Sequence, residues 1–170
     1  MGLDEVEWRE VNLADVFTVI QRGKRLIKSN QIEGDQPYVS STMNLNGIDA
    51  FIGNDQHVRC FENCLTIANS GSVGNVFYHP YKFVASDHVT ALINNNFSPC
   101  HYRFIAVCLR STGKKYSFNR EMSDRRIRRE RILLPVNKNG EVDYHFMEKY
   151  MADQENKILS RVERFINEYV

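Results

Sequence analysis

The most regular pattern of apolar and polar positions lies near the C-terminus. Apolar residues recur there in steps of three and four, at Met147, Met151, Ile158, Val162, Phe165 and Tyr169, and Gln154 occupies one position of the same series. This spacing is typical of the seam of a coiled coil. It predicts a helix over residues 144–168, roughly 36 Å long at 1.5 Å per residue. Because that length exceeds what the rest of the chain can cover, we expect these apolar residues to form a dimer or subunit interface.

A shorter helix is expected near the N-terminus. Asn12 followed by Asp15 is typical of a helix start, and one apolar face follows at Leu13, Val16, Phe17 and Ile20. Gly23 is then expected to close the helix in the left-handed conformation that glycine adopts easily.

The central part of the chain alternates between β-prone runs and turn sequences. Two hairpins are predicted, one with strands at residues 38–42 and 48–52 and one with strands at residues 64–68 and 75–78. Further strands are expected at residues 83–85 and 89–93, whereas the apolar run at residues 102–109 fits either a buried strand or a helix. The prediction is therefore an α+β fold. A compact, strand-rich domain with short helices spans residues 1–143, and a long coiled-coil-type helix spans residues 144–170.

Charge is distributed unevenly along the chain. The 22 basic and 21 acidic residues leave a net charge of only +1, yet residues 114–131 hold eight Lys or Arg and three acids. Such a concentration indicates a surface for a polyanion. Within it, Ser123 and Asp124 are expected to cap a short turn, and the arginines that follow are expected to divide between the polyanion and acidic groups of the domain or of a partner protein. The apolar residues 132–134 should anchor the segment in the core, Pro135 should end that strand, and residues 139–140 should form a turn.

Several classes of protein are disfavoured by the sequence. The first residues, MGLDEVEWRE, resemble no signal peptide, and no apolar run is long enough to span a membrane, so a cytoplasmic protein is expected. The four cysteines are expected to be reduced and mostly buried, although Cys60 and Cys64 with His57 or His79 form a remote alternative as a zinc site. The dipeptide Asp87-His88 is interpreted as a local hydrogen-bonding pair rather than as acid–base chemistry.

Motifs for catalysis are also missing from the sequence. It contains no P-loop, no nucleophile elbow, no HExxH motif, no glycine-rich motif for S-adenosylmethionine and no convincing nuclease cluster. A binding protein without an enzymatic activity or a cofactor of its own is therefore the favoured class.

The order of several local motifs resembles one known family. The motifs are GKR at residues 23–25, PYVSS at 37–41, LTIA at 65–68, GSVG at 71–74, ASDHV at 85–89, YSF at 116–118, LPV at 134–136 and MEKY at 147–150. Together they resemble the target recognition domain of type I restriction-modification specificity subunits, including their relatives in BcgI-like enzymes. The resemblance covers nearly the whole chain.

This resemblance implies a DNA-reading module that works with other subunits. In the family, two such domains are separated by long paired helices, and each domain reads one half of a bipartite target in double-stranded DNA. A methyltransferase subunit would carry S-adenosylmethionine, and a restriction subunit would carry the nuclease. Because this chain has one domain and one helix, it resembles half of a specificity subunit, and a homodimer through the helix would restore the pair.

The resemblance also places candidate DNA-binding residues on surface loops. Candidates for phosphate contacts are Lys24, Arg25, Lys28, Lys114 and Lys115. Candidates for base edges, phosphates or stacking are Ser41, Asn44, Asn46, Ser72, Asn75, Tyr78, Tyr116, Asn119, Arg120, Arg125 and Arg128. Two alternatives stay open: a truncated specificity subunit that acts as a protein-interaction module, and the recognition fragment of a fused restriction–methyltransferase enzyme.

Overall fold

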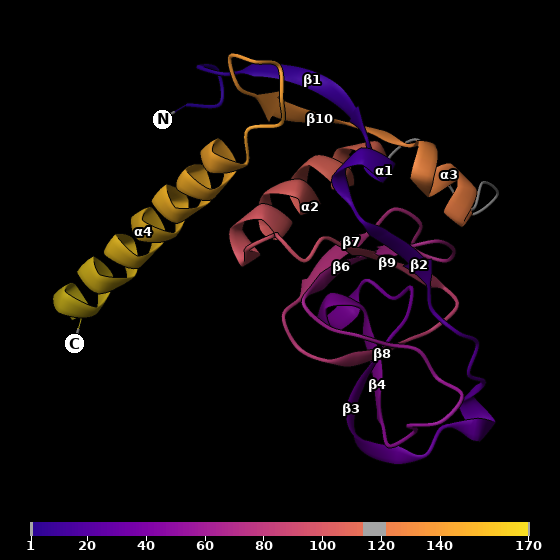
Figure 1. Ribbon diagram of the computed structural model, residues 1–170. Helices are drawn as coiled ribbons and strands as arrows, with labels where there is room; N and C mark the ends of the chain where they lie inside the picture. Colours follow the sequence, from indigo (N-terminus) through magenta and orange to yellow (C-terminus); the bar gives the residue numbers. More distant parts are fainter. Residues whose placement is uncertain (1, 114–121, 170) are drawn as a thin grey trace.

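The computed structural model describes residues 2–113 and 122–169 of the chain (Figure 1). Its strands form three sheets. The first is antiparallel, in the order β2 (Val19–Arg22), β9 (Val89–Ile93), β6 (Cys64–Ala68) and β7 (Val76–His79). The second has the order β4 (Ile48–Ile52), β3 (Glu33–Val39), β8 (Phe83–Ala85) and β5 (Cys60–Phe61), with β3 and β8 parallel. The third pairs β1 (Glu7–Asn12) with β10 (Arg131–Val136).

The helices pack around the first and third sheets. They are α1 (Leu13–Val16), α2 (Pro99–Gly113), α3 (Asp124–Arg129) and α4 (Tyr144–Tyr169), with single 3₁₀ turns η1 (Lys28–Asn30) and η2 (Asn44–Gly47). Helix α2 decides the open assignment of residues 102–109 in favour of a helix. Its residues Tyr102, Ile105 and Leu109 are fully buried in the main apolar core, together with residues from α1, β6 and β10. The predicted α+β class with a long C-terminal helix is confirmed.

Both predicted hairpins are present. Strands β6 and β7 pair from Cys64 with His79 to Ile67 with Val76, and β3 pairs with β4. The first strand of the β3–β4 hairpin begins earlier than expected and ends at Val39. The turn between these strands is η2, where Leu45, Asn46 and Gly47 all have positive φ.

The N-terminal helix is shorter than the apolar spacing predicted. It ends at Val16, and the chain turns into β2 because Val19 to Arg22 pair with β9. Asn12 occupies the N-cap position without a capping hydrogen bond from its side chain. Gly23 caps no helix. It follows β2, and a Cβ atom there would lie 2.1 Å from the carbonyl oxygen of Ser86, so glycine is required by close backbone contact.

Strand β10 also differs in detail from its prediction. Pro135 does not end the strand but lies inside it, opposite Trp8, and Val136 is the last residue. A two-stranded sheet tolerates proline because each of its strands has an unpaired edge. Ile132 and Leu134 are buried as expected, whereas Leu133 points outward and is 54% exposed. The turn at Gly140 is confirmed by its φ of 80°.

Helix α4 starts within the domain and then extends away from it (Figure 1). Its first turn is capped by Asp143, whose Oδ1 accepts a hydrogen bond from the Phe146 amide at 2.9 Å. Met147 was predicted to lie in the interface, but it is fully buried in the core of its own domain. Met151 is half-buried against the same core. Ile158, Val162 and Phe165 are exposed, and the side chain of Tyr169 lies outside the described residues.

The cysteines are free thiols with different degrees of exposure. Cys64 is buried, which raises the pKa of its thiol to about 12. Cys60 is exposed and the other two are half-buried, so the expectation of mostly buried thiols is wrong. Within residues 2–113 and 122–169, no group of three or more His, Cys, Asp or Glu side chains is arranged to hold a metal ion. Among the helices of the same residues, none has the length and apolar character needed to cross a membrane.

Candidate nucleic-acid interface

Loops that are far apart in the sequence meet at one end of the first sheet. Arg22 at the end of β2 pairs with Thr90, and Ala68 at the end of β6 pairs with Val89. The segment after β2, the β6–β7 loop at residues 69–75 and the segment before β9 therefore lie together. We call these three segments, with the β3–β4 loop at residues 40–47, the loop cluster.

Asn69 ties these segments together from inside. It is fully buried, and its amide donates to the His88 carbonyl at 2.8 Å. Its side chain donates to the Asp87 carbonyl at 3.3 Å and accepts from the Thr90 hydroxyl at 2.8 Å. The Asn69 carbonyl accepts from the Met122 amide at 3.0 Å. Met122, which lies within the basic segment at residues 114–131, is thereby anchored at the loop cluster.

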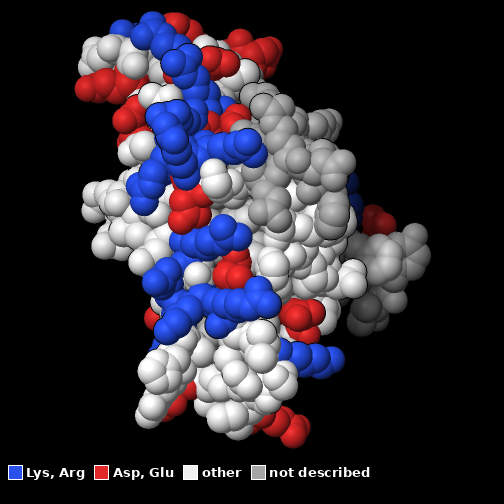
Figure 2. Space-filling view, turned by 90° about the vertical axis from the view of Figure 1, so that its right-hand side faces the viewer, with Lys and Arg blue, Asp and Glu red and all other residues white. Residues whose placement is uncertain are grey.

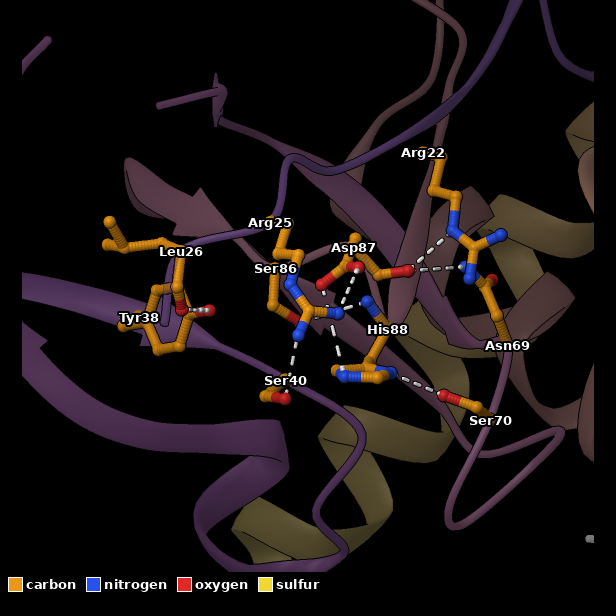
Figure 3. A network of polar contacts seen from close by, with 10 residues as sticks. All are labelled: Arg22, Arg25, Leu26, Tyr38, Ser40, Asn69, Ser70, Ser86, Asp87 and His88. Atoms are coloured by element: carbon orange, nitrogen blue, oxygen red, sulfur yellow. Dashed lines mark hydrogen bonds and ion pairs between the residues drawn. The ribbon is translucent and has the colours of Figure 1, made fainter. Parts of the chain in front are cut away.

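A second network lies on the surface of the cluster (Figure 3). Asp87 lies 3.9 Å from both Arg25 and His88, and the His88 ring is hydrogen-bonded to the Ser70 hydroxyl at 2.6 Å. The His88 amide donates to the Ser86 hydroxyl at 3.1 Å. Asp87 and His88 thus make local hydrogen bonds and ion pairs, as expected from the sequence. Arg25 is held weakly, because its side chain is 73% exposed.

Three arginines are fixed by backbone carbonyls beside this network. Arg128 donates to the Ile20 carbonyl at 2.6 Å, Arg22 donates to the Asp87 carbonyl at 2.5 Å, and Arg59 donates to the Arg22 carbonyl. Together with residues 18–21 and Asp124, they line an open hollow of about 420 Å³. A carbonyl holds a guanidinium in place without neutralising its charge, and the remaining N–H groups can bind phosphate in a forked geometry.

Helix α3 extends the positive surface. Its N-cap Ser123 accepts from the Arg126 amide at 3.4 Å, and Ile127 fixes the helix in the core. Arg125, Arg126 and Arg129 line a further open hollow of about 630 Å³. Figure 2 shows a band of Lys and Arg, interrupted by a few acids, along the side of the molecule that carries α3 and β2. This band faces away from α4.

Arg131 is used differently from the arginines of α3. It lies on β10 and pairs with Glu10 of the neighbouring strand at 3.5 Å. It also donates to the Asn12 side chain at 3.4 Å. The expectation that some of these arginines pair with acids of the domain is confirmed at this residue.

The structure brings most of the described candidates to the loop cluster or to α3. Lys24, Arg25 and Lys28 are exposed after β2, Asn44 and Asn46 are exposed on η2, Arg125 and Arg128 lie on α3, and Ser41, Ser72 and Asn75 are half-buried. The β3–β4 and β6–β7 loops touch where the Ser72 amide donates to the Ser41 carbonyl at 3.4 Å. Lys114, Lys115, Tyr116, Asn119 and Arg120 lie outside the described residues.

Tyr78 is not part of the cluster. It pairs with Leu65, toward the opposite end of the sheet, and its ring stacks on Tyr102 at a centroid distance of 5.3 Å. Its hydroxyl donates to Asn63 at 2.8 Å. These contacts give Tyr78 a packing role between β7 and α2.

Three residues in or beside the loop cluster were missed from the sequence. Arg22 immediately precedes the motif GKR and was assigned to the predicted helix, although the continuous basic run was a usable signal. His88 was recognised only as a local hydrogen-bonding residue. Arg59 lies in a segment without a periodic pattern, and only the fold brings it to Arg22.

Comparison with known proteins identifies the class of this domain. The sequence profile of the family described as type I restriction modification DNA specificity domain matches residues 5–164. The chain therefore belongs to this family, whose members are specificity subunits and are non-catalytic.

The similar proteins are specificity subunits. The chain is 33% identical over 163 residues to S.BcgI, the specificity subunit of a type II restriction enzyme from Heyndrickxia coagulans, which covers 94% of this chain and 47% of that subunit. The crystal structure of a type I S subunit from M. genitalium has the same fold, with a TM-score of 0.65, 17% identity, and coverage of 96% of this chain and 42% of that one. The HsdS subunit from Thermoanaerobacter tengcongensis matches with a TM-score of 0.60, 14% identity, and coverage of 92% and 39%. The chain thus spans less than half the length of these relatives.

Proposed function

We propose that this chain reads one half of a bipartite target in double-stranded DNA and docks a methyltransferase subunit that supplies S-adenosylmethionine. A restriction subunit would complete the assembly. The observation that carries this proposal is the loop cluster, where polar side chains lie beside arginines that backbone carbonyls hold in place, although these residues come from distant parts of the sequence. The family to which the chain belongs supports the same function.

The arginines in and beside the loop cluster and the polar residues of its loops suit two different tasks. Arg22, Arg59 and Arg128 are preorganised for phosphate oxygens, which position a protein on DNA without specifying sequence. The side chains of Asn44, Asn46, Ser72 and Asn75 carry the amide and hydroxyl groups that distinguish base edges. Phosphate contacts would therefore fix the position of the protein along the DNA, and the four polar side chains would read the base sequence.

Titration of duplex DNA at several salt concentrations tests this proposal. Binding should weaken steeply with salt, and Arg128→Ala should reduce the slope of log affinity against log salt by about 1. Lys138→Ala is the matched control, because Lys138 is exposed in the turn after β10 and remote from the cluster. DNA binding that is absent or insensitive to salt would refute the proposed function.

We further propose that the C-terminal half of α4 pairs with a second copy of the chain. Ile158 and Phe165 are 60% and 62% exposed, and Leu159, Val162 and Ile166 extend the same apolar surface. A homodimer would place two recognition domains on the two halves of a bipartite site. A coiled coil is the geometry that this spacing favours.

Sedimentation of full-length variants tests the dimer. Ile158→Asp should shift the wild-type dimer to monomer, because it removes apolar area and introduces a charge at the seam. Ser160→Asp adds the same charge to the same helix and should leave the dimer intact. Point variants are preferable to a chain that ends near residue 139, because Phe146 and Met147 belong to the core. A monomeric wild-type chain would refute the dimer.

A second candidate function is a protein-interaction module that binds the methyltransferase without reading DNA. The exposed apolar half of α4 and the net charge of +1 favour it. Co-purification of the chain with the methyltransferase, without DNA affinity in the assembled complex, would distinguish this function. The reading frame around the gene would show whether the chain is instead the recognition part of a fused enzyme.

A further inference from the structure

The tip of the β3–β4 loop has an unusual backbone. Leu45 has φ 46° and ψ 40°, and Asn46 has φ 55° and ψ 36°. Both are in the left-handed region, which is unfavourable for residues other than glycine and rare for a leucine. Gly47 follows with φ 87°, so three consecutive residues have positive φ. Such conformations persist only where the surrounding structure enforces them, and they are concentrated at functional sites.

The surrounding structure does hold this tip in place. The Ser40 amide donates to the Gly47 carbonyl at 2.9 Å, and the Asn44 amide donates to the Thr42 hydroxyl at 3.2 Å. Gly47 itself is buried, and a Cβ there would lie 3.4 Å from the rings and methyls of Phe77 and Val39. The base of the loop is thus packed against β7 and β3, and the tip is presented rigidly.

The tip presents apolar side chains to solvent. Leu45 is 75% exposed and Met43 is 66% exposed, the two most exposed large apolar side chains among the described residues. Neither helps to bury the core. A strained backbone that holds a leucine in water is costly in the free protein, which indicates that the tip acquires a partner when the protein functions.

The neighbours of the tip identify that partner as DNA. Ser41, next to the tip, contacts Ser72 of the β6–β7 loop. Ser40, at the base of the same loop, is hydrogen-bonded to Ser86, beside Asp87 and Arg25 (Figure 3). The apolar tip is therefore surrounded by polar groups suited to base edges and by cations suited to phosphates. A protein partner of purely apolar character would not match these surroundings.

We infer that Leu45, supported by Met43, is an apolar wedge that inserts between two stacked base pairs of the DNA. Leucine and methionine are among the side chains that DNA-bending proteins use to part a base step. A rigid tip suits this task because a flexible one would fold back before it parted the bases. Base steps differ in their resistance to unstacking, so the wedge would add sequence preference without a hydrogen bond to a base. This inference rests on the proposed DNA-reading function.

Permanganate oxidation of bound DNA tests the wedge, because permanganate attacks unstacked thymines. A pool of duplexes with a randomised centre is first enriched for sequences that the full wild-type chain binds. Wild-type protein should then produce enhanced oxidation at one base step of the enriched duplexes. Leu45→Ala should abolish the enhancement and lower affinity for the enriched duplexes about tenfold, while affinity for the unenriched pool and the salt slope stay unchanged.

Two further variants separate the wedge from other roles of the residue. Leu45→Lys adds a cation, so it should bind the unenriched pool more tightly and still give no enhanced oxidation. Leu133→Ala removes another exposed leucine, on β10, and should behave as wild type in every assay. Thermal unfolding should be unchanged in Leu45→Ala because the side chain makes no contribution to the core.

The possible failures are distinguishable. Wild-type binding without enhanced oxidation, or with enhancement that survives in Leu45→Ala, overturns the wedge and leaves the DNA-reading function standing. Loss of methyltransferase co-purification in Leu45→Ala, with DNA binding and oxidation unchanged, overturns it in favour of a protein contact. A wild-type chain that binds no DNA overturns the proposed function and the wedge together.

Discussion

The two halves of α4 share one apolar spacing but lie in different surroundings. In the first half, Phe146 and Met147 are 4% and 0% exposed and pack against α2, with Phe104 in an edge-to-face contact with Phe146. In the second half, Ile158 and Phe165 are mostly exposed. A periodic stripe therefore predicts a helix and its apolar face, but it does not reveal which part of that face the same chain covers. We attribute the uncovered half to assembly.

The strongest test of this contrast is truncation of a side chain in the covered half. Met147→Ala should lower the free energy of unfolding by about 2–5 kcal/mol, because it leaves a cavity in the core. Ile158→Ala is the matched variant in the uncovered half and should change it by less than about 0.5 kcal/mol at concentrations where the chain is monomeric. Urea unfolding measures both, and equal effects would break the distinction between the halves.

Acid should destabilise the domain that anchors the first half. His79 is fully buried between Thr66 and Tyr81, and burial lowers its pKa from 6.5 to about 4. Between these pH values His79 is protonated in the unfolded chain but neutral in the folded chain. The contribution of neutral His79 to the free energy of unfolding is fully present above pH 6.5. The free energy of unfolding should then fall by about 3 kcal/mol as the pH drops to 4.

Unfolding free energies measured across this pH range test the contribution of His79. His79→Gln can retain a hydrogen bond to Thr66 and should flatten the pH dependence, even if its stability at pH 7 is lower. A slope as steep in His79→Gln as in the wild type would assign the acid sensitivity to other groups.

The border between the halves is marked by an ion pair. Arg103 of α2 pairs with Glu155 of α4, and both side chains are nearly half exposed. Such a pair contributes only about 0.2–1 kcal/mol, and salt screens it. A double-mutant cycle with Arg103→Ala and Glu155→Ala should give a coupling energy in that range that vanishes at high salt. A larger, salt-independent coupling would move the border of the covered half further along the helix.

The smallest effect is expected at the far end of α4. Phe165→Ser should leave the unfolding free energy of the monomer within about 0.5 kcal/mol of wild type. In the wild type, the melting temperature should rise with protein concentration because association stabilises the folded state. Phe165→Ser should remove this concentration dependence. Calorimetry at several concentrations would decide the matter, and a concentration-dependent melting temperature in the variant would place the interface elsewhere.

The strands were predictable because their signals are local. The predicted hairpins at residues 38–52 and 64–78 combine β-prone residues with turn sequences, and both features act within a few residues. The prediction for the N-terminal helix was too long because a contact with a distant strand determines where the helix ends. Ile20 continues its apolar spacing, yet the pairing of Ile20 with Leu92 of β9 outweighs the helical pattern. Gly23 was predicted to be a helix cap. A glycine is needed there for another reason, because the backbone of Ser86 lies too close for a side chain.

The candidate site was predictable only as a set of loops. Lys24, Arg25 and Asn44 are exposed and were found from composition and motif order. Arg59 and the role of Asn69 could not be found, because their partners lie 37 and 21 residues away along the chain. Tyr78 was predicted to contact DNA, whereas the structure shows its ring stacked on Tyr102, because an aromatic residue next to a polar loop can pack in the core as readily as bind a ligand.

The loops are held by the buried hydrogen bonds of Asn69, whereas the side chains proposed to contact DNA belong to other residues. Three different segments are secured by this one side chain and its backbone, while Asn44, Asn46, Ser72 and Asn75 contribute little to the interior. On the proposed function, randomising those four positions is expected to change the DNA target while the scaffold stays unaltered. The same arrangement would let a substitution at the displayed positions leave the fold intact, because the buried hydrogen bonds of Asn69 do not involve them.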